Sequence, residues 1–129
     1  MPLVRISVPE HFTPERRKAL SDAVHDAMVE TINVPVADRF QIMTRHNPAE
    51  LVIDPAFLDI NRGADAVIVQ ITLRAGRSND QKRALYARIV AFAAQKAAMR
   101  PSDIMTTLVE NSLPDWSFGG GIAQYQPMG

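Results

Sequence analysis

The chain begins with MPLVRISV, residues 1–8, in which a proline directly follows the initiator methionine and opens an apolar segment. The even-numbered residues from Pro2 to Val8 are apolar, a period of two that predicts a half-buried strand. If Met1 is removed, Pro2 becomes a secondary amine at the end of that strand. The pKa of a free α-amine is about 7.7–8.0, so Pro2 is a candidate acid or base near neutral pH. The alternative is that Pro2 only provides a stable N-terminus.

A helix and a second strand follow. Thr13 directly before a proline predicts a helix N-terminus, and apolar residues at helical spacing extend the helix from about residue 14 to 32. The pair Val34-Pro35 ends it, because a residue before proline is disfavoured in the helical conformation. Residues 40–44 predict the second strand. Residues from about 2 to 45 therefore form one β-α-β unit.

The layout of this unit returns 65 residues later. Ser78, which begins a capping-box pattern, corresponds to Thr13, and the strand pattern at 4–8 recurs at 69–73. The second helix is expected to end near Arg100, and residues 104–111 predict a fourth strand. Few residues are identical between the halves, so chance similarity of two amphipathic helices is the alternative. Matched caps and strands nevertheless favour a structural repeat, with the second unit at about 66–111.

Each helix is long enough for a right-handed crossover between parallel strands. The sequence thus predicts a single domain, residues 1–129, of the α/β class (two-layer α+β): tandem β-α-β units that form a four-stranded, mainly parallel sheet with two helices on one face. The apolar run at 67–69 indicates a strand covered on both faces, so we expect other copies of the chain to cover the open face. Residues 46–64 are too long for a simple connection and are expected to hold a short strand and a functional loop.

Composition excludes several classes of function. Lys and Arg together number 14, as do Asp and Glu, so no broad charge favours nucleic acid or an anionic membrane. The absence of cysteine excludes disulfides and thiolate metal sites. His11, His25 and His46 show no ligand spacing, His25 being expected as a surface or packed side chain of the first helix, so we expect neither a metal nor a cofactor. No apolar run could span a bilayer, which favours a cytoplasmic protein with a small-molecule partner.

Three charged residues are candidates for substrate binding or catalysis. Asp38 precedes the second predicted strand, and Arg74 and Arg77 stand at the end of the third. Two guanidiniums at a strand end suit a bidentate grip on a carboxylate. A lone aspartate at such a place is also typical of a turn, and the arginines equally fit a solvated loop.

The C-terminal tail, residues 112–129, holds aromatic residues around a glycine triplet and has little helix or strand pattern. The aromatic residues are Trp116, Phe118 and Tyr125. They predict either an aromatic wall folded over a site or a plug at a subunit interface.

Together these features resemble the tautomerase superfamily, and within it most of all the malonate semialdehyde decarboxylase branch. The resemblance is carried by Pro2, the doubled β-α-β layout, the two arginines, PVADRF at 35–40, and the segments 109–112 and 115–119. It runs over nearly the whole chain. It implies a homotrimer without a cofactor, removal of Met1, and catalysis by the proline amine on a small carboxylate substrate.

The resemblance also implies roles for single residues. Pro2 is the catalytic amine, Asp38 works beside it, Arg74 and Arg77 hold the substrate carboxylate, and Trp116, Phe118 and, less directly, Tyr125 line the pocket. One departure stands out, because the decarboxylase pattern has one residue between its arginines and this chain has two. The second arginine therefore either points elsewhere or is brought back by a bent loop.

Three functions remain open at this point. A neutral Pro2 amine acting as a base predicts keto–enol tautomerisation of a 2-oxo acid, which needs only Pro2 and one arginine and is the preferred hypothesis. A cationic Pro2 predicts decarboxylation of a 3-oxo acid, or a related hydratase or dehalogenase reaction. Nearby guanidiniums disfavour the cation and a carboxylate favours it. If Met1 is retained, the Pro2 nitrogen is an amide, and the chain would be a non-catalytic trimeric module that binds a carboxylate.

Overall fold

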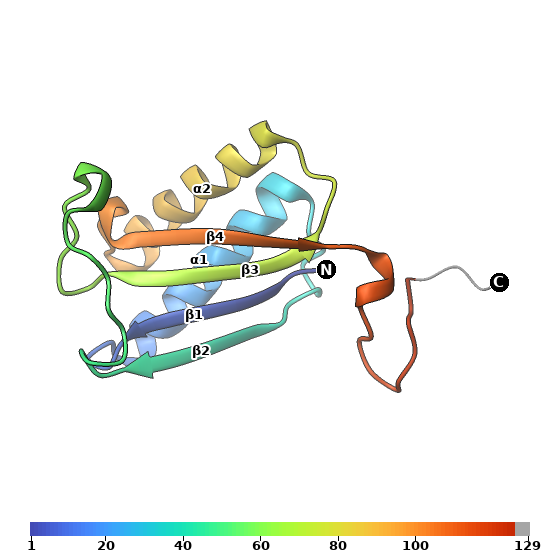
Figure 1. Cartoon of the computed structure of the whole chain (residues 1–129), viewed down its shortest axis with the longest axis horizontal. Helices are drawn as coiled ribbons and strands as arrows, with labels where there is room; N and C mark the ends of the chain where they lie inside the picture. Colours follow the sequence, from blue (N-terminus) through green and yellow to red (C-terminus); the bar gives the residue numbers. More distant parts are fainter. Residues whose placement is uncertain (126–129) are drawn as a thin grey trace.

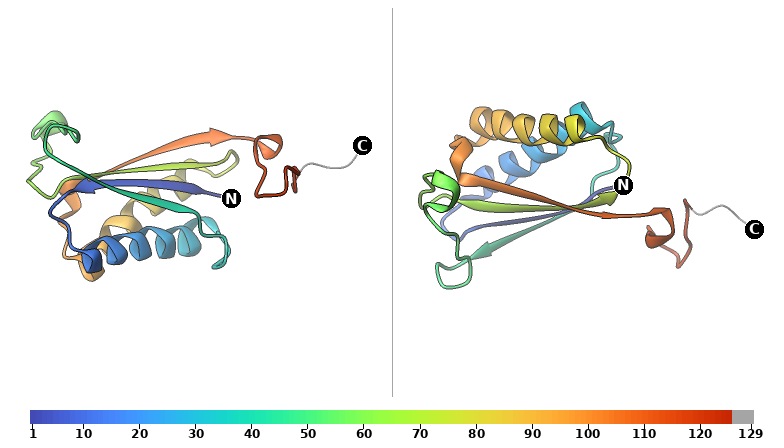
Figure 2. Two further views of the ribbon diagram at one scale, coloured as in Figure 1. Left: turned by 90° about the horizontal axis from the view of Figure 1, so that it is seen from below. Right: turned by 45° about the horizontal axis from the view of Figure 1, so that its top comes forward.

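The computed structural model describes residues 1–125 and shows a four-stranded sheet with both helices on one face (Figure 1). The two layers are separate when the molecule is turned, and the opposite face of the sheet carries no helix (Figure 2). This confirms the predicted fold class. In chain order the elements are β1 (Leu3–Pro9), α1 (Pro14–Ile32), β2 (Gln41–His46), β3 (Val67–Arg74), α2 (Asn79–Ala97) and β4 (Ile104–Asn111).

The two helices are matched in length and in both caps. Each has 19 residues. The side chain of Thr13 caps the first turn of α1, and Ser78 forms the predicted capping box with Gln81 at the start of α2. Each helix is followed by a C-cap residue in the left-handed conformation, Asn33 after α1 and Ala98 after α2, and these two residues also lie 65 positions apart. The structure therefore confirms the repeat, although α2 ends at Ala97, a little before the expected end.

The strand order is β2-β1-β3-β4. Each half contributes one parallel pair, β1 with β2 and β3 with β4, whereas the central pair β1–β3 is antiparallel. In the central register Leu3 lies opposite Thr72. As a result, the start of β1 lies beside the end of β3, and the chain's amino group meets the residues that follow Leu73.

The core lies between the sheet and the helices. Alternate residues of β1 and β3 are almost fully buried there, as the period-two pattern predicts, and they pack on the inner faces of α1 and α2. The other sheet face carries exposed apolar side chains on its outer strands: Ile42, Met105 and Val109. The sheet is thus covered on one side within this chain.

The connection from β2 to β3 contains no strand, so the predicted short strand within residues 46–64 is wrong. Its only regular piece is a short 3₁₀ helix, Phe57–Asp59. The Asp54 carboxylate accepts hydrogen bonds from two backbone amides, and Arg62 donates to the carbonyl groups of Asp54 and Phe57. The loop satisfies these backbone groups from within, so it does not need to pair with the sheet.

The tail after β4 is described as far as Tyr125. It contains a short 3₁₀ helix, Leu113–Asp115, and runs beyond the end of the sheet at which the N-terminus lies (Figure 1). The last four residues of the predicted tail, 126–129, lie outside the described part of the chain. Within residues 1–125, neither helix is long and apolar enough to cross a membrane.

Candidate active site

The chain's amino group forms an ion pair with a carboxylate at the start of β1. The nitrogen of Met1 contacts Oδ2 of Asp38, and the two side chains are 7% and 15% exposed. Pro2 is buried next to this pair. With Met1 present, the Pro2 nitrogen is an amide without a basic lone pair. Removal of Met1 would transfer the free amine to Pro2, one residue along the same strand.

Asp38 reaches this position through a tight turn between α1 and β2. Helix α1 ends at Asn33, Val34 is buried, and the backbone N–H of Asp38 donates to the carbonyl of Pro35 at 3.0 Å. The turn directs the half-buried aspartate toward the first residues of β1. The sequence interpretation of Asp38 as a turn residue and its candidate role beside the amine are therefore compatible.

The two arginines approach the same place from the end of β3. Arg74 is exposed, and Arg77 is half-buried. Gly76 has a φ of 127°, which an L side chain rarely adopts, and it bends the loop so that the guanidinium of Arg77 turns back. Nη1 of Arg77 donates to the carbonyl of Arg74 at 3.0 Å, and Nη2 lies 3.5 Å from the carbonyl of Ile32. Of the two alternatives for the extra residue, the structure has the bent loop.

These groups line one small pocket of about 160 Å³. Its lining brings together the amine, the carboxylate and both guanidiniums from segments far apart in the sequence. The lining residues are Met1, Asn33, Pro35, Asp38, Arg74, Arg77 and Tyr125. The pocket thus places an amine and a carboxylate, which can exchange a proton, beside two guanidiniums that can bind an anion.

Burial lowers the pKa of Arg77, the neighbouring Arg74 guanidinium lowers it further, and the carboxylates of Asp38 and Glu110 oppose both effects. A guanidinium still carries its charge at neutral pH. The direction of this pKa shift shows that Arg77 stands in a partly desolvated, cation-rich place. An anionic ligand there would relieve the repulsion between the two arginines.

The aromatic residues of the tail form a stack beside the pocket. Trp116 and Phe118 stack with ring centroids 5.4 Å apart, and Tyr125 meets Phe118 edge-on at 5.6 Å. Nε1 of Trp116 donates to Oδ1 of Asn111 at 2.7 Å. Of the three, only Tyr125 lines the pocket. Phe118 packs against Tyr125, and Trp116 packs against Phe118, so these two rings do not reach the pocket lining.

Two residues near the pocket were missed in the sequence analysis. Phe40 packs on Phe118 at a centroid distance of 5.5 Å and so joins the aromatic stack to the start of β2. Asn33 lines the pocket, where it adopts the left-handed conformation that ends α1. Asparagine tolerates this conformation, so an asparagine directly after a helical pattern could have indicated the C-cap of α1.

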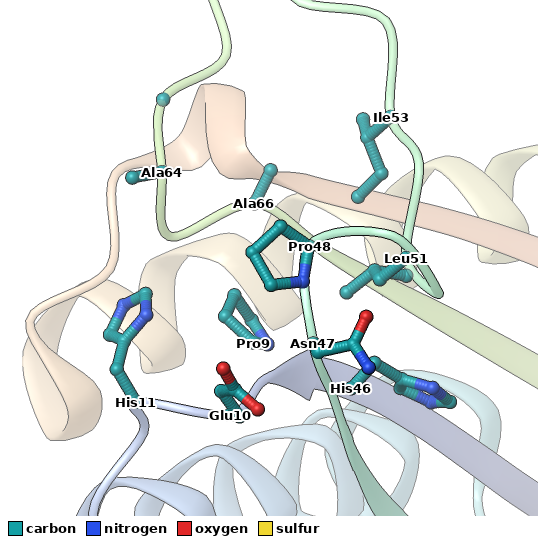
Figure 3. A pocket seen from close by; sticks show the side chains of 11 residues that line it. Pro9, Glu10, His11, His46, Asn47, Pro48, Leu51, Ile53, Ala64 and Ala66 are labelled. Carbon is teal, nitrogen blue, oxygen red and sulfur yellow. The ribbon is translucent and has the colours of Figure 1, made fainter.

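A second hollow, of about 350 Å³, lies at the opposite end of the sheet (Figure 3). The figure shows Glu10, His11 and His46 around it together with prolines and aliphatic side chains. Nε2 of His11 lies 2.7 Å from Oδ1 of Asp65. No arginine lines this hollow. Residues 1–125 contain no group of three or more His, Cys, Asp or Glu side chains that could hold a metal ion.

Comparisons with known proteins agree with the fold. A family model described as tautomerase enzyme matches residues 38–119, and a second with the same description matches residues 2–56. The probable tautomerase YusQ of Bacillus subtilis (strain 168) is 34% identical over 124 residues, which cover 96% of this chain and 98% of YusQ.

Solved structures extend the comparison. FG41 malonate semialdehyde decarboxylase, inhibited by 3-bromopropiolate, is 39% identical, with a TM-score of 0.90 over 95% of this chain and 93% of that one. A second malonate semialdehyde decarboxylase, studied for decarboxylase and hydratase activities, is 34% identical, with a TM-score of 0.90 over 95% of both chains. A fused 4-OT symmetric trimer shares the fold at 24% identity and a TM-score of 0.78, over 95% of this chain and 97% of that one. The chain belongs to the tautomerase enzyme family.

Proposed function

We propose that the chain, after removal of Met1, is an enzyme that uses the Pro2 amine as an acid or base on small oxo-carboxylates, and that its reaction is keto–enol tautomerisation. The observation that carries this proposal is the ion pair between the chain's amino group and Asp38, in a pocket shared with Arg74 and Arg77. Membership of the tautomerase family supports the reaction class.

The pocket offers each group that this reaction needs. A neutral Pro2 nitrogen takes a proton from the carbon next to the carbonyl of a 2-oxo acid, the electrons of that C–H bond form a carbon–carbon double bond, and the π electrons of the carbonyl move to its oxygen. A guanidinium stabilises the negative charge on that oxygen, and the substrate carboxylate binds to the arginines. Return of the proton to oxygen gives the enol. In this proposal Tyr125 borders the substrate, with Trp116 and Phe118 supporting it.

Decarboxylation of a 3-oxo acid is the second candidate. It is favoured by the two malonate semialdehyde decarboxylase structures, 39% and 34% identical to this chain. A cationic Pro2 would donate a hydrogen bond to the 3-oxo oxygen, the bond to the carboxyl carbon would break, and carbon dioxide would leave as the enol forms. Asp38 favours the cation this route requires.

We further propose that the chain assembles as a homotrimer through the open face of its sheet. This face exposes Ile42, Met105 and Val109, which are 37%, 47% and 51% exposed. Exposed apolar side chains gathered on an uncovered sheet face are typical of subunit interfaces. The fused 4-OT protein, which has this fold, is a symmetric trimer.

The proposal is tested by comparing protein that has lost Met1, verified by intact mass, with its Pro2→Ala variant on a panel of 2-oxo, 3-oxo and unsaturated halo-acids. Alanine leaves a primary amine, so kcat/KM should fall by no more than the roughly 10²–10⁴-fold that general acid–base catalysis contributes. For a tautomerase kcat/KM should rise with pH through the Pro2 midpoint, because only the neutral amine is a base. For a decarboxylase it should fall. Retention of Met1 throughout the protein from its native host would remove the proposed catalytic group.

Arg74 is expected to be the principal carboxylate anchor. It ends a regular strand with its guanidinium exposed, whereas Arg77 already donates to the carbonyl of Arg74. Loss of a charged hydrogen bond of about 1.5–3 kcal/mol corresponds to roughly a 10–100-fold lower kcat/KM for Arg74→Ala. Arg77→Ala should have a smaller effect. Steady-state kinetics on the same substrate measure both, and equal losses would instead indicate a joint clamp.

Gly76→Ala should perturb the site through the backbone alone. An added Cβ would meet no atom within 4 Å, but the φ of 127° is strained for alanine. We expect a loss of stability on the order of 1–3 kcal/mol in urea unfolding, or a loop shift that withdraws Arg77 and raises KM. Gly63→Ala is the matched control, because Gly63 has no such φ and its Cβ would make ordinary contacts at 3.7 Å. Equal behaviour of the two variants would contradict the bent-loop explanation.

Sedimentation equilibrium at micromolar concentration checks the assembly. We expect three times the mass of one chain, and Met105→Lys should shift the protein toward monomer by placing a charge on the open sheet face. Met105 lies on the outer strand β4 and is 47% exposed, so the change should leave the fold of one chain intact. A wild-type monomer would refute the homotrimer.

A further inference from the structure

The segment that carries Asp38 has little apolar packing of its own. Pro35, Val36 and Ala37 have exposed side chains, with Val36 at 74%. Only Val34, at the start of the segment, is almost fully buried. Packing therefore fixes where the segment leaves α1, whereas hydrogen bonds must fix the turn that presents the aspartate.

His25, on α1, provides a hydrogen bond to the middle of this turn. Its side chain is 3% exposed, and its Nε2 lies 2.8 Å from the carbonyl oxygen of Val36. A carbonyl only accepts, so Nε2 carries the proton. Nδ1 is buried and has no partner in residues 1–125. An unpaired buried nitrogen is unfavourable, so packing alone would favour an apolar residue here.

The repeat gives an internal comparison for this position. Sixty-five residues after His25, at the equivalent place on α2, the chain has Val90. The fold thus accepts an apolar side chain at this helical position. The first half differs because His25 lies next to the turn that carries Asp38, and its Nε2 donates to the carbonyl of Val36 in that turn.

Apart from the ion pair of Asp38 itself, the other contacts hold the two ends of the segment but not its middle. The N–H of Val34 donates to the carbonyl of Met28 at 3.3 Å, and Nη2 of Arg39 donates to Oδ1 of Asp22 at 2.7 Å. Among residues 1–125, His25 is the only side chain from another element that donates to a backbone carbonyl of the turn between these ends. The N–H of Asp38 bonds within the turn, so a shift of the turn carries the aspartate with it.

We propose that His25 is a positioning residue for Asp38: by holding the carbonyl of Val36, it keeps the Asp38 carboxylate beside the N-terminal amine. This inference rests on the pairing of Asp38 with the Pro2 amine in the proposed function, because a carboxylate in contact with that amine favours its protonated form in either of the two candidate reactions. His25 does not line the pocket and acts only through the turn. Without the hydrogen bond, the exposed turn moves and the carboxylate lies farther from the amine.

The test compares wild type, His25→Leu, His25→Gln and Asp38→Asn, each without Met1. The readout is the titration midpoint of the Pro2 nitrogen, followed by NMR with ¹⁵N-labelled proline, which requires no substrate. Asp38→Asn should lower the midpoint, because it removes the charge that stabilises the cation. His25→Leu should lower it by at least half as much. His25→Gln, whose Nε2–H₂ donates at a similar reach, should stay closer to wild type than to His25→Leu.

Each outcome supports or overturns the inference. If Asp38→Asn lowers the midpoint but His25→Leu only lowers the melting temperature, His25 is merely structural and the inference fails while the proposed function stands. If Asp38→Asn itself leaves the midpoint unchanged, the role of Asp38 in the proposed function fails, and this inference fails with it. Should His25→Leu not fold, His25→Asn replaces it, because its shorter amide does not reach Val36. A midpoint in His25→Asn equal to that in His25→Gln would then overturn the inference.

Discussion

The antiparallel pairing of β1 with β3 is the constraint on which the site depends. Each half is a parallel β-α-β unit, and a side-by-side parallel arrangement would have put the start of β1 beside the start of β3. With Leu3 opposite Thr72, the start of β1 instead meets the end of β3 and the arginines beyond it. A slip of either central strand by one residue would turn the buried side chains of that strand to the open face, so the hydrophobic core fixes this register.

The charges gathered by that pairing oppose one another. Asp38 forms an ion pair with the amino group, whereas Arg74 and Arg77 bring positive charge to the same pocket, and the pKa of Arg77 is lowered first by burial and then by the neighbouring Arg74 guanidinium. Coulomb interactions fall with distance, so the carboxylate in contact with the amine acts on it more strongly than groups farther along the pocket wall. A substrate carboxylate would bring the balancing anion.

The sequence predicted the parts of this fold that are set locally. Caps and apolar spacing defined both helices, and the strands followed from alternation. The short strand expected within residues 46–64 was wrong because the apolar residues of this stretch favour a strand, whereas Asp54 and Arg62 satisfy backbone groups of the loop from within. The direction of the Arg77 side chain depends on the positive φ of Gly76, and a glycine in the sequence does not reveal which φ it adopts. The partner of His25 is a backbone carbonyl 11 positions away, and no side-chain pattern encodes it.

The repeat also explains why the chemistry lies at one end of the sheet. Sixty-five residues after Asp38 stands Asp103, which is 4% exposed and accepts a hydrogen bond from the backbone N–H of Gly63 at 2.8 Å. In both halves, then, a carboxylate holds the segment that leads into a central strand. In the second half the donor is a peptide N–H that cannot titrate; in the first half it is the chain's own amino group. The position equivalent to Arg74 is Pro9, and the arginines near the opposite end, Arg16 and Arg100, pair with Asp65 and Asp103 and do not line the hollow.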